Sequence, residues 1–299
     1  MAVIKLEGGF ALITGAASGI GKETAFTFAE SGAAGILLAD IDESNALVAA
    51  EDSKKLAVDP AYRAIAIHVD VTNADSVNSM VAYAVKEFGR IDYCVNSAGV
   101  SIAIPFPTDI RRLTLQCKID ISTYFIPFSN SSVEDYDKVM RVNAKGTFLV
   151  TQAALKQMSV QEPRDVTTTR NRTRSLGRGT IVNVASVLSF GAIPQKVAYI
   201  ASKHAVLGIT KVAALEGGPL GIRVNCVCPA WVRTAMFVEE CTRAPHTADI
   251  IKAMISQGRP AEPEEVSESI GFLCSAAGSY ITGVGFIIDA GLTLTAHLG

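Results

Sequence analysis

The chain has 299 residues, of which 49% are hydrophobic and 19% are charged, and its formal net charge is −2. This length and apolar content are enough for a large buried core, so we expect one domain over residues 1–299. A near-neutral charge without a concentrated basic patch argues against DNA or RNA as a partner.

Nothing near the N-terminus predicts export or a membrane anchor. Residues 1–15 lack a basic segment before a long apolar stretch, and no apolar run in the chain is long enough to cross a bilayer. The six cysteines lack the density of a disulfide framework, and Cys226-Val227-Cys228 has the wrong spacing for a zinc half-site. We therefore expect a cytoplasmic protein with reduced thiols, no metal ion and no membrane contact.

Strand-like apolar runs alternate with helix-length segments along the chain. Strands are expected at residues 10–14, 35–39, 64–69, 91–96, 180–185, 223–228 and 285–289. Helices are expected at residues 22–31, 75–88, 133–156, 199–216 and 263–276. Strands with nearly continuous hydrophobicity are typical of a parallel sheet covered by helices on both faces. The alternation therefore predicts a single-domain α/β fold with a Rossmann-like, doubly wound parallel sheet.

Two stretches, residues 101–132 and 159–179, fit this alternation poorly and are expected to be insertions. The first mixes three prolines with apolar residues, which suits a flap beside the site, an interface or a surface excursion without function. The second carries five arginines among threonines without interleaved aromatic residues. We expect it to be a solvated, mobile loop rather than an anion or nucleic-acid site.

A glycine-rich turn follows the first strand, with Gly15, Gly19 and Gly21 in the spacing Gly-x-x-x-Gly-x-Gly. Glycine lets the backbone turn sharply and approach a phosphate, and free amides at a helix N-terminus carry partial positive charge. The turn therefore predicts a dinucleotide phosphate site that also includes Ser18 and Ile20. A glycine turn that serves only chain reversal is the alternative.

Asp40 ends the second strand, nineteen residues after Gly21. A carboxylate here accepts hydrogen bonds from the adenosine ribose hydroxyls of NAD but repels the 2′-phosphate of NADP. Its neighbours Ile41 and Asp42 add no cation. NAD is therefore predicted as the cofactor over NADP. The alternative is that Asp40 only caps the helix that begins near Asp42.

A second motif combines a serine, a tyrosine and a lysine. Tyr199 and Lys203 are four residues apart, which places both side chains on one face of a helix. Ser186 lies thirteen residues before Tyr199, behind an apolar strand, and Asn143 lies earlier in a predicted helix. With the glycine-rich turn, these residues resemble the short-chain dehydrogenase/reductase family over nearly the whole chain.

The resemblance implies an oxidoreductase with Asn143, Ser186, Tyr199 and Lys203 as a catalytic tetrad. Tyr199 would act as the acid/base, because Lys203 and the positive nicotinamide lower the pKa of its phenol. Ser186 would stabilise the substrate oxygen, and Asn143 would anchor a water in a proton relay. Lys203 would also hold the nicotinamide ribose.

Further cofactor positions follow from the resemblance alone. The adenine ring is expected near Asp70 and Val71, and the base of its pocket near Asn96, Ala98 and Gly99. The nicotinamide is expected near Pro229, Val232 and Thr234. The chain departs from the family's usual residues at Ser97, where asparagine is more common, and at Ala230, where glycine is usual.

The substrate side is predicted from closeness to these motifs. Its candidate residues are mostly apolar, which favours a secondary alcohol or ketone on a hydrophobic skeleton, although core positions explain the same pattern. The candidates are Val100, Ile102, Ser186, Leu188, Gln195, Trp231, Met236 and Phe237. Residues 231–260, interrupted by Pro245 and Gly258, are expected to form a mobile substrate lid.

Three functions remain open at this point. The leading one is an NAD-dependent short-chain alcohol dehydrogenase/reductase that acts on CH-OH groups of a small molecule. A non-catalytic NAD-binding sensor or scaffold of the same fold is opposed by the intact tetrad, and an NADPH-dependent ketoreductase is opposed by Asp40. The resemblance also implies a homodimer or homotetramer, paired through the helices that hold Asn143 and Tyr199.

Overall fold

The computed structural model describes residues 4–6, 8–101, 128–167, 170–243 and 247–294. Most of the first predicted insertion, including the candidate residue Ile102, lies outside these described residues.

Seven parallel strands form the central sheet, in the order β3-β2-β1-β4-β7-β8-β9. They are β1 (Phe10–Thr14), β2 (Gly35–Asp40), β3 (Arg63–His68), β4 (Tyr93–Asn96), β7 (Gly179–Val184), β8 (Ile222–Pro229) and β9 (Gly285–Ile288). Each lies within two residues of its predicted bounds. The doubly wound α/β prediction is therefore confirmed, and the strand order reverses between β1 and β4.

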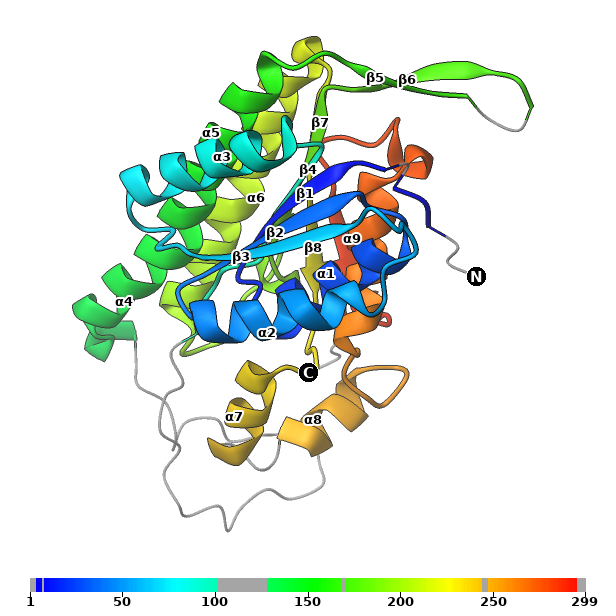
Figure 1. The fold of residues 1–299 in the computed structure, drawn as a ribbon. Coiled ribbons are helices and arrows are strands. Elements are labelled where there is room, and N and C mark those ends of the chain that lie inside the picture. Colours follow the sequence, from blue (N-terminus) through cyan, green and yellow to red (C-terminus); the bar gives the residue numbers. More distant parts are fainter. Residues whose placement is uncertain (1–3, 7, 102–127, 168–169, 244–246, 295–299) are drawn as a thin grey trace.

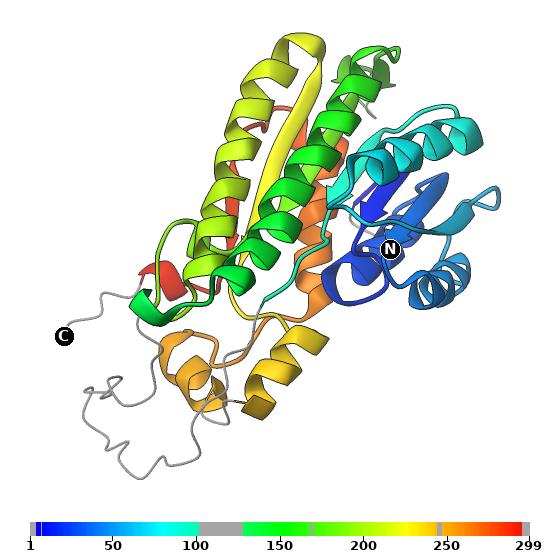
Figure 2. The ribbon, with the colours of Figure 1, turned by 90° about the vertical axis from the view of Figure 1, so that its left-hand side faces the viewer.

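Helices cover both faces of this sheet, as Figures 1 and 2 show. One buried apolar cluster joins the sheet to α1 (Gly19–Glu30), α2 (Glu43–Lys54) and α9 (Pro263–Cys274). A second joins the opposite face to α3 (Ala74–Phe88), α5 (Thr147–Ser159) and α6 (Val197–Gly217). Local signals fix the helix ends, since the Asn73 side chain accepts the first amides of α3 and Gly89 ends it with φ 82°.

The helix predicted at residues 133–156 consists of three consecutive parts. They are α4 (Val133–Val139), a π-helical segment, η3 (Met140–Gly146), and α5. A π-helical turn holds an additional residue and shifts the face that the following side chains present. This local irregularity carries Asn143, and a uniform α-helical periodicity does not predict it.

The second predicted insertion is folded, in contrast to the loop that the sequence suggested. It contains an antiparallel hairpin of β5 (Arg164–Thr167) and β6 (Thr173–Gly177), which projects from the body in Figure 1. Arg164 Nη1 lies 3.4 Å from the Asp92 carboxylate, and Arg174 donates a 2.7 Å hydrogen bond to the Ala276 carbonyl. Two of its arginines therefore tie the hairpin to the body.

Residues 231–260 contain two short helices, α7 (Ala235–Arg243) and α8 (Thr247–Met254), beside the carboxyl ends of the strands (Figure 1). The buried side chains Phe237, Ile251 and Ile255 of this segment form a small separate apolar cluster. An isolated bridge between Val232 and Ala261 joins the two ends of this segment. Its predicted motion as a lid stays a prediction.

Among the described residues, no helix has the length and apolar character needed to cross a membrane.

Candidate active site

A cavity of about 1000 Å³ opens at the carboxyl ends of the strands, where the strand order reverses. This volume is at the upper end of the roughly 300–1000 Å³ typical of small-molecule sites. Most of the predicted site residues line it. Four of them, as far as the structure describes the cavity wall, do not: Gly21, Asn96, Asn143 and Gln195.

The glycine-rich turn forms one wall because its backbone packs more closely than a side chain would allow. Gly15 has φ 67°, and a Cβ there would lie 2.5 Å from the Ala98 amide nitrogen. Gly19 has φ 54° and borders the cavity beside Thr234. A Cβ on Gly21 would overlap the Gly15 carbonyl. Gly21 therefore lies behind the turn rather than in the cavity wall, and its predicted contact with the cofactor stays a prediction.

Asp40 lies at the end of β2 and faces the cavity. Its carboxylate accepts hydrogen bonds from the amides of Ala17, at 2.9 Å, and Asp42, at 3.0 Å. The N-cap of α2 is Asp42, whose side chain accepts from the Asn45 amide. The alternative that Asp40 only caps this helix is therefore wrong. Asp40 is instead oriented by the glycine-rich turn at the cavity wall.

The adenine side of the predicted site contains both exposed and buried polar groups. Asp70 and Val71 line the cavity, as do Ala98 and Gly99. Asn96 is buried below them and donates to Asn183 Oδ1 at 2.7 Å and to Thr151 Oγ1 at 3.1 Å. Asn96 thus joins β4 to β7 and α5, and it supports the cavity floor.

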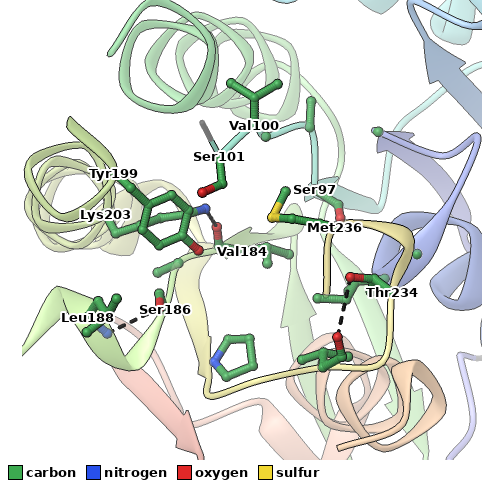
Figure 3. A pocket seen from close by; sticks show the side chains of 18 of the residues that line it. Ser97, Val100, Ser101, Val184, Ser186, Leu188, Tyr199, Lys203, Thr234 and Met236 are labelled. Atoms are coloured by element: carbon green, nitrogen blue, oxygen red, sulfur yellow. Dashed lines mark hydrogen bonds between the residues drawn. The ribbon is translucent and has the colours of Figure 1, made fainter. Parts of the chain in front are cut away.

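Ser186, Tyr199 and Lys203 converge on the same part of the cavity. Figure 3 shows the Tyr199 hydroxyl pointing toward Ser186, and the Lys203 ammonium lying beside the ring of Tyr199. The Lys203 nitrogen is 5.5 Å from the centroid of that ring. The four-residue spacing on α6 therefore places phenol and amine on one face, next to the serine that follows β7.

Asn143 holds the loop after β4 rather than lining the cavity. Its Oδ1 accepts from the Val100 amide at 2.8 Å, and its Nδ2 donates to the Val100 carbonyl at 2.9 Å and to Ser202 Oγ at 3.1 Å. The π-helical turn places this side chain between α6 and the β4 loop. Its predicted role as the anchor of a water stays a prediction.

Burial shifts the pKa values of both central groups toward their neutral forms. It raises the pKa of Tyr199 to about 12, an effect that Glu240 reinforces and the Ser186 side chain opposes. It lowers the pKa of Lys203 to about 8. The predicted lowering of the phenol pKa includes the positive nicotinamide of bound NAD and stays a prediction. In the protein alone, loss of hydration raises this pKa.

Most of the predicted nicotinamide and substrate residues also belong to the cavity wall. Pro229, Val232 and Thr234 line it, as do Leu188, Trp231 and Met236. Gln195 does not, although its φ of 72° is unusual for a residue other than glycine. The neighbouring Lys196 lines the cavity instead and pairs with Glu240 of α7 at 2.8 Å.

Sequence reasoning missed several residues of this end, among them Phe190, Ile193, Lys196 and Glu240. Phe190 and Ile193 follow Ser186 closely, so their place in the chain was an available signal. The described residues contain no group of three or more His, Cys, Asp or Glu side chains that could hold a metal ion. Each described cysteine is a free thiol.

Known proteins resemble the chain along almost its whole length. A family model described as enoyl-(acyl carrier protein) reductase matches residues 15–293. The short-chain dehydrogenase fogB of Aspergillus ruber is 42% identical over 288 residues, which cover 96% of this chain and 98% of the relative. The NAD-dependent glycerol dehydrogenase of Listeria innocua is 35% identical, with 95% of this chain and 93% of the relative covered.

Solved structures agree with this relationship. A short-chain alcohol dehydrogenase from Sinorhizobium meliloti, described as putative in its published name, has a TM-score of 0.78 and 28% identity, covering 98% of this chain and 99% of the other. Levodione reductase has a TM-score of 0.79 and 26% identity, covering 98% and 100%. The matched model, the relatives and the fold agree, and the chain belongs to the short-chain dehydrogenase/reductase family of oxidoreductases.

Proposed function

We propose that this oxidoreductase transfers a hydride between NAD(H) and a secondary alcohol or ketone on a largely hydrophobic small molecule. The convergence of Ser186, Tyr199 and Lys203 at one end of the cavity carries the proposal. Family membership implies a nicotinamide cofactor. The choice of NAD, the substrate class and the roles of the tetrad are the parts proposed here.

The cavity wall suits a nicotinamide cofactor, because a different polar group of the wall would face each part of the cofactor. The close-packed turn around Gly15 and Gly19 leaves room for the pyrophosphate at the start of α1. Asp40 would accept the adenosine ribose hydroxyls, and Lys203 would donate to the nicotinamide ribose. Thr234 would face the carboxamide. When bound, the cofactor supplies a positively charged ring that accepts the hydride.

Side chains of the protein would accept or donate the proton in the same reaction. In oxidation, the carbinol C–H bond breaks with its electron pair leaving as hydride, and the alcohol proton passes to the Tyr199 oxygen. Ser186 would donate a hydrogen bond to the substrate oxygen. Because burial raises the pKa of Tyr199 to about 12, the positive ring and Lys203 must together favour the phenolate.

The charge around Asp40 supports NAD over NADP. The described wall residues from the glycine-rich turn and from the end of β2 include no lysine or arginine. A 2′-phosphate would therefore lie beside an unbalanced carboxylate. One relative carries NAD dependence in its name, the glycerol dehydrogenase of Listeria innocua.

The substrate end supports a neutral, hydrophobic molecule. Its wall combines Leu188, Phe190, Ile193, Trp231 and Met236. Apolar and aromatic walls favour apolar ligands, with few polar groups that fix orientation. Relatives named for glycerol and D-threitol carry polyols in their names, so this chain's apolar wall predicts a different preference.

We also propose a homodimer or homotetramer that uses α5 and α6. Phe148 on α5 and Val212 and Leu215 on α6 are exposed, with 46%, 56% and 79% of their surfaces accessible. A second copy covering these side chains would remove apolar surface from water. A cytoplasmic location stays a prediction from the sequence.

The test measures NADH formation by absorbance, with purified protein, NAD or NADP, and a panel of secondary alcohols of increasing apolar size. NADH formation by the wild type and its loss in Tyr199→Phe, with cofactor binding intact, would support the proposal. Cofactor binding without turnover of any alcohol or ketone would instead favour the non-catalytic sensor or scaffold.

A further inference from the structure

Besides its covalent connections, the segment that contains α7 contacts the rest of the protein through backbone hydrogen bonds and through apolar packing. At its base, the Ala261 amide donates to the Trp231 carbonyl and the Arg233 amide donates to the Ala261 carbonyl, both at 2.9 Å. On its inner side, Phe237 packs in the apolar cluster with Ile251 and Ile255. Neither contact joins α7 to the catalytic helix α6.

One ion pair makes that connection. Lys196 Nζ lies 2.8 Å from Glu240 Oε1, and the two side chains expose only 26% and 29% of their surfaces. Lys196 directly precedes α6, three residues before Tyr199, and Glu240 lies on α7. Both line the cavity. The pair therefore connects the start of α6 to α7 at the substrate end of the cavity.

The backbone conformation before Lys196 supports a specific role for its ion pair with Glu240. Gln195 has φ 72°, a left-handed conformation that costs a residue other than glycine about 1 kcal/mol or more. This turn directs the chain into α6 and leaves Lys196 facing the cavity. An ordinary surface lysine needs no such local geometry.

The charged groups that line the cavity with Tyr199 are few. Among the described residues they are Asp40, Asp70, Lys138, Lys196, Lys203 and Glu240. Lys203 of α6 adjoins the phenol ring, and Glu240 of α7 opposes ionisation of the phenol by its negative charge. Lys196 partly neutralises Glu240. The pair thus joins α7 to the start of α6 and also affects how much negative charge faces Tyr199 from α7.

We propose that Lys196 and Glu240 are positioning residues that hold α7 against α6, and so keep the substrate end of the cavity closed over Tyr199. This inference goes beyond the proposed function, but the tests of it that measure activity rest on the proposed function. The substrate end then presents a paired, locally neutral set of charges to a bound alcohol. Breaking either partner should weaken substrate retention without weakening cofactor binding.

The experiment compares Glu240→Gln, Lys196→Met and the exchange K196E/E240K. Because a partly exposed ion pair contributes modestly, each single variant should raise KM for the alcohol about two- to fivefold, with the dissociation constant for NADH unchanged. The exchange variant should return KM toward the wild-type value. Glu87→Gln, which removes the surface pair of Arg63 and Glu87, is the matched control and should change nothing.

The pH profile separates positioning from a general loss of structure. In alcohol oxidation, the acidic limb of kcat/KM reports ionisation of the base, Tyr199 in the proposal. Glu240→Gln removes a negative charge and should move that limb to lower pH. Lys196→Met leaves Glu240 unneutralised and should move it to higher pH. The exchange variant places a positive charge on α7, so its limb should lie at lower pH although KM recovers.

Limited trypsin digestion provides a readout that does not need turnover. Cleavage after Lys252 in α8 should be about two- to fivefold faster in both single variants, with unchanged melting temperature, and near wild type in the exchange variant. If the wild type binds NADH but oxidises no alcohol, the proposed function fails while faster cleavage still supports the contact. Unchanged cleavage in the single variants, or an unchanged KM in an active enzyme, overturns the inference.

Discussion

The Lys203 ammonium donates a 2.8 Å hydrogen bond to the Val184 carbonyl, at the last residue of β7. Ser186 follows two residues later, so the same strand end positions both the amine and the proposed oxyanion donor. The contact also orients Lys203 toward the ring of Tyr199. A buried amine with one carbonyl acceptor is a costly arrangement, and its cost should be measurable as a dependence of stability on pH.

Lys203 should make the protein more stable as pH rises from about 8 to 10.5. Burial lowers its pKa in the folded protein to about 8, below the ordinary 10.5 of the unfolded chain, so the unfolded chain binds more protons in this range. The gain approaches roughly 3 kcal/mol at full effect. Tyrosines and cysteines with raised pKa values oppose it, so the quantity to measure is the difference between wild type and Lys203→Met.

That difference should be obtained from urea denaturation at pH 7 and pH 10. The wild type should gain free energy of unfolding relative to Lys203→Met as pH increases. If the free energy of unfolding changed equally with pH in the two proteins, the Lys203 amine would not be desolvated, contrary to the structure.

Tyr199 should ionise only near pH 12 in the protein alone, because burial raises its pKa. An ultraviolet difference titration of wild type against Tyr199→Phe isolates this phenol from the other tyrosines. With saturating NAD, the positive ring should bring the ionisation to lower pH. A midpoint that NAD leaves unaltered would argue against Tyr199 as the base.

Asp40→Asn should shift the cofactor preference. The variant keeps the size of the side chain and one acceptor oxygen, but removes the charge that opposes a 2′-phosphate. We expect kcat/KM for NAD to fall about tenfold and discrimination against NADP to weaken, since one charged hydrogen bond contributes ~1.5–3 kcal/mol. Steady-state kinetics with both cofactors measure this. A wild type that prefers NADP would remove the role given to Asp40.

How well the sequence predicts each structural element depends on whether its residues make local or tertiary contacts. Strands buried on both faces, such as β7 and β8, are mostly apolar and were predicted within two residues. Helix α2 was predicted only at its start, because its buried face is made of Ala46, Ala49 and Ala50, which give little periodicity. The hairpin β5–β6 escaped prediction because its exposed threonines and arginines show no alternation.

The same distinction applies to the site. Gly15, Asp40 and Ser186 lie at or just after strand ends, where the topology of a parallel sheet brings residues together. Local motifs therefore found them. The pair of Lys196 and Glu240 is separated by 44 positions and forms only once α7 packs beside α6. The π-helical turn at Asn143 likewise depends on its tertiary partners Val100 and Ser202.

A buried amide network beneath the site should determine stability more than chemistry. Asn183 is fully buried; its Oδ1 accepts from Asn96 at 2.7 Å, and its Nδ2 donates to Thr210 at 2.9 Å. Asn183→Ala should lower the free energy of unfolding by about 2–4 kcal/mol, because it removes buried hydrogen bonds from both partners and leaves a cavity in the core. Asn78→Ala, on the exposed side of α3, is the matched control and should change it by less than about 0.5 kcal/mol. Equal effects of the two substitutions, measured by urea denaturation, would mean that the network contributes no more than a surface amide.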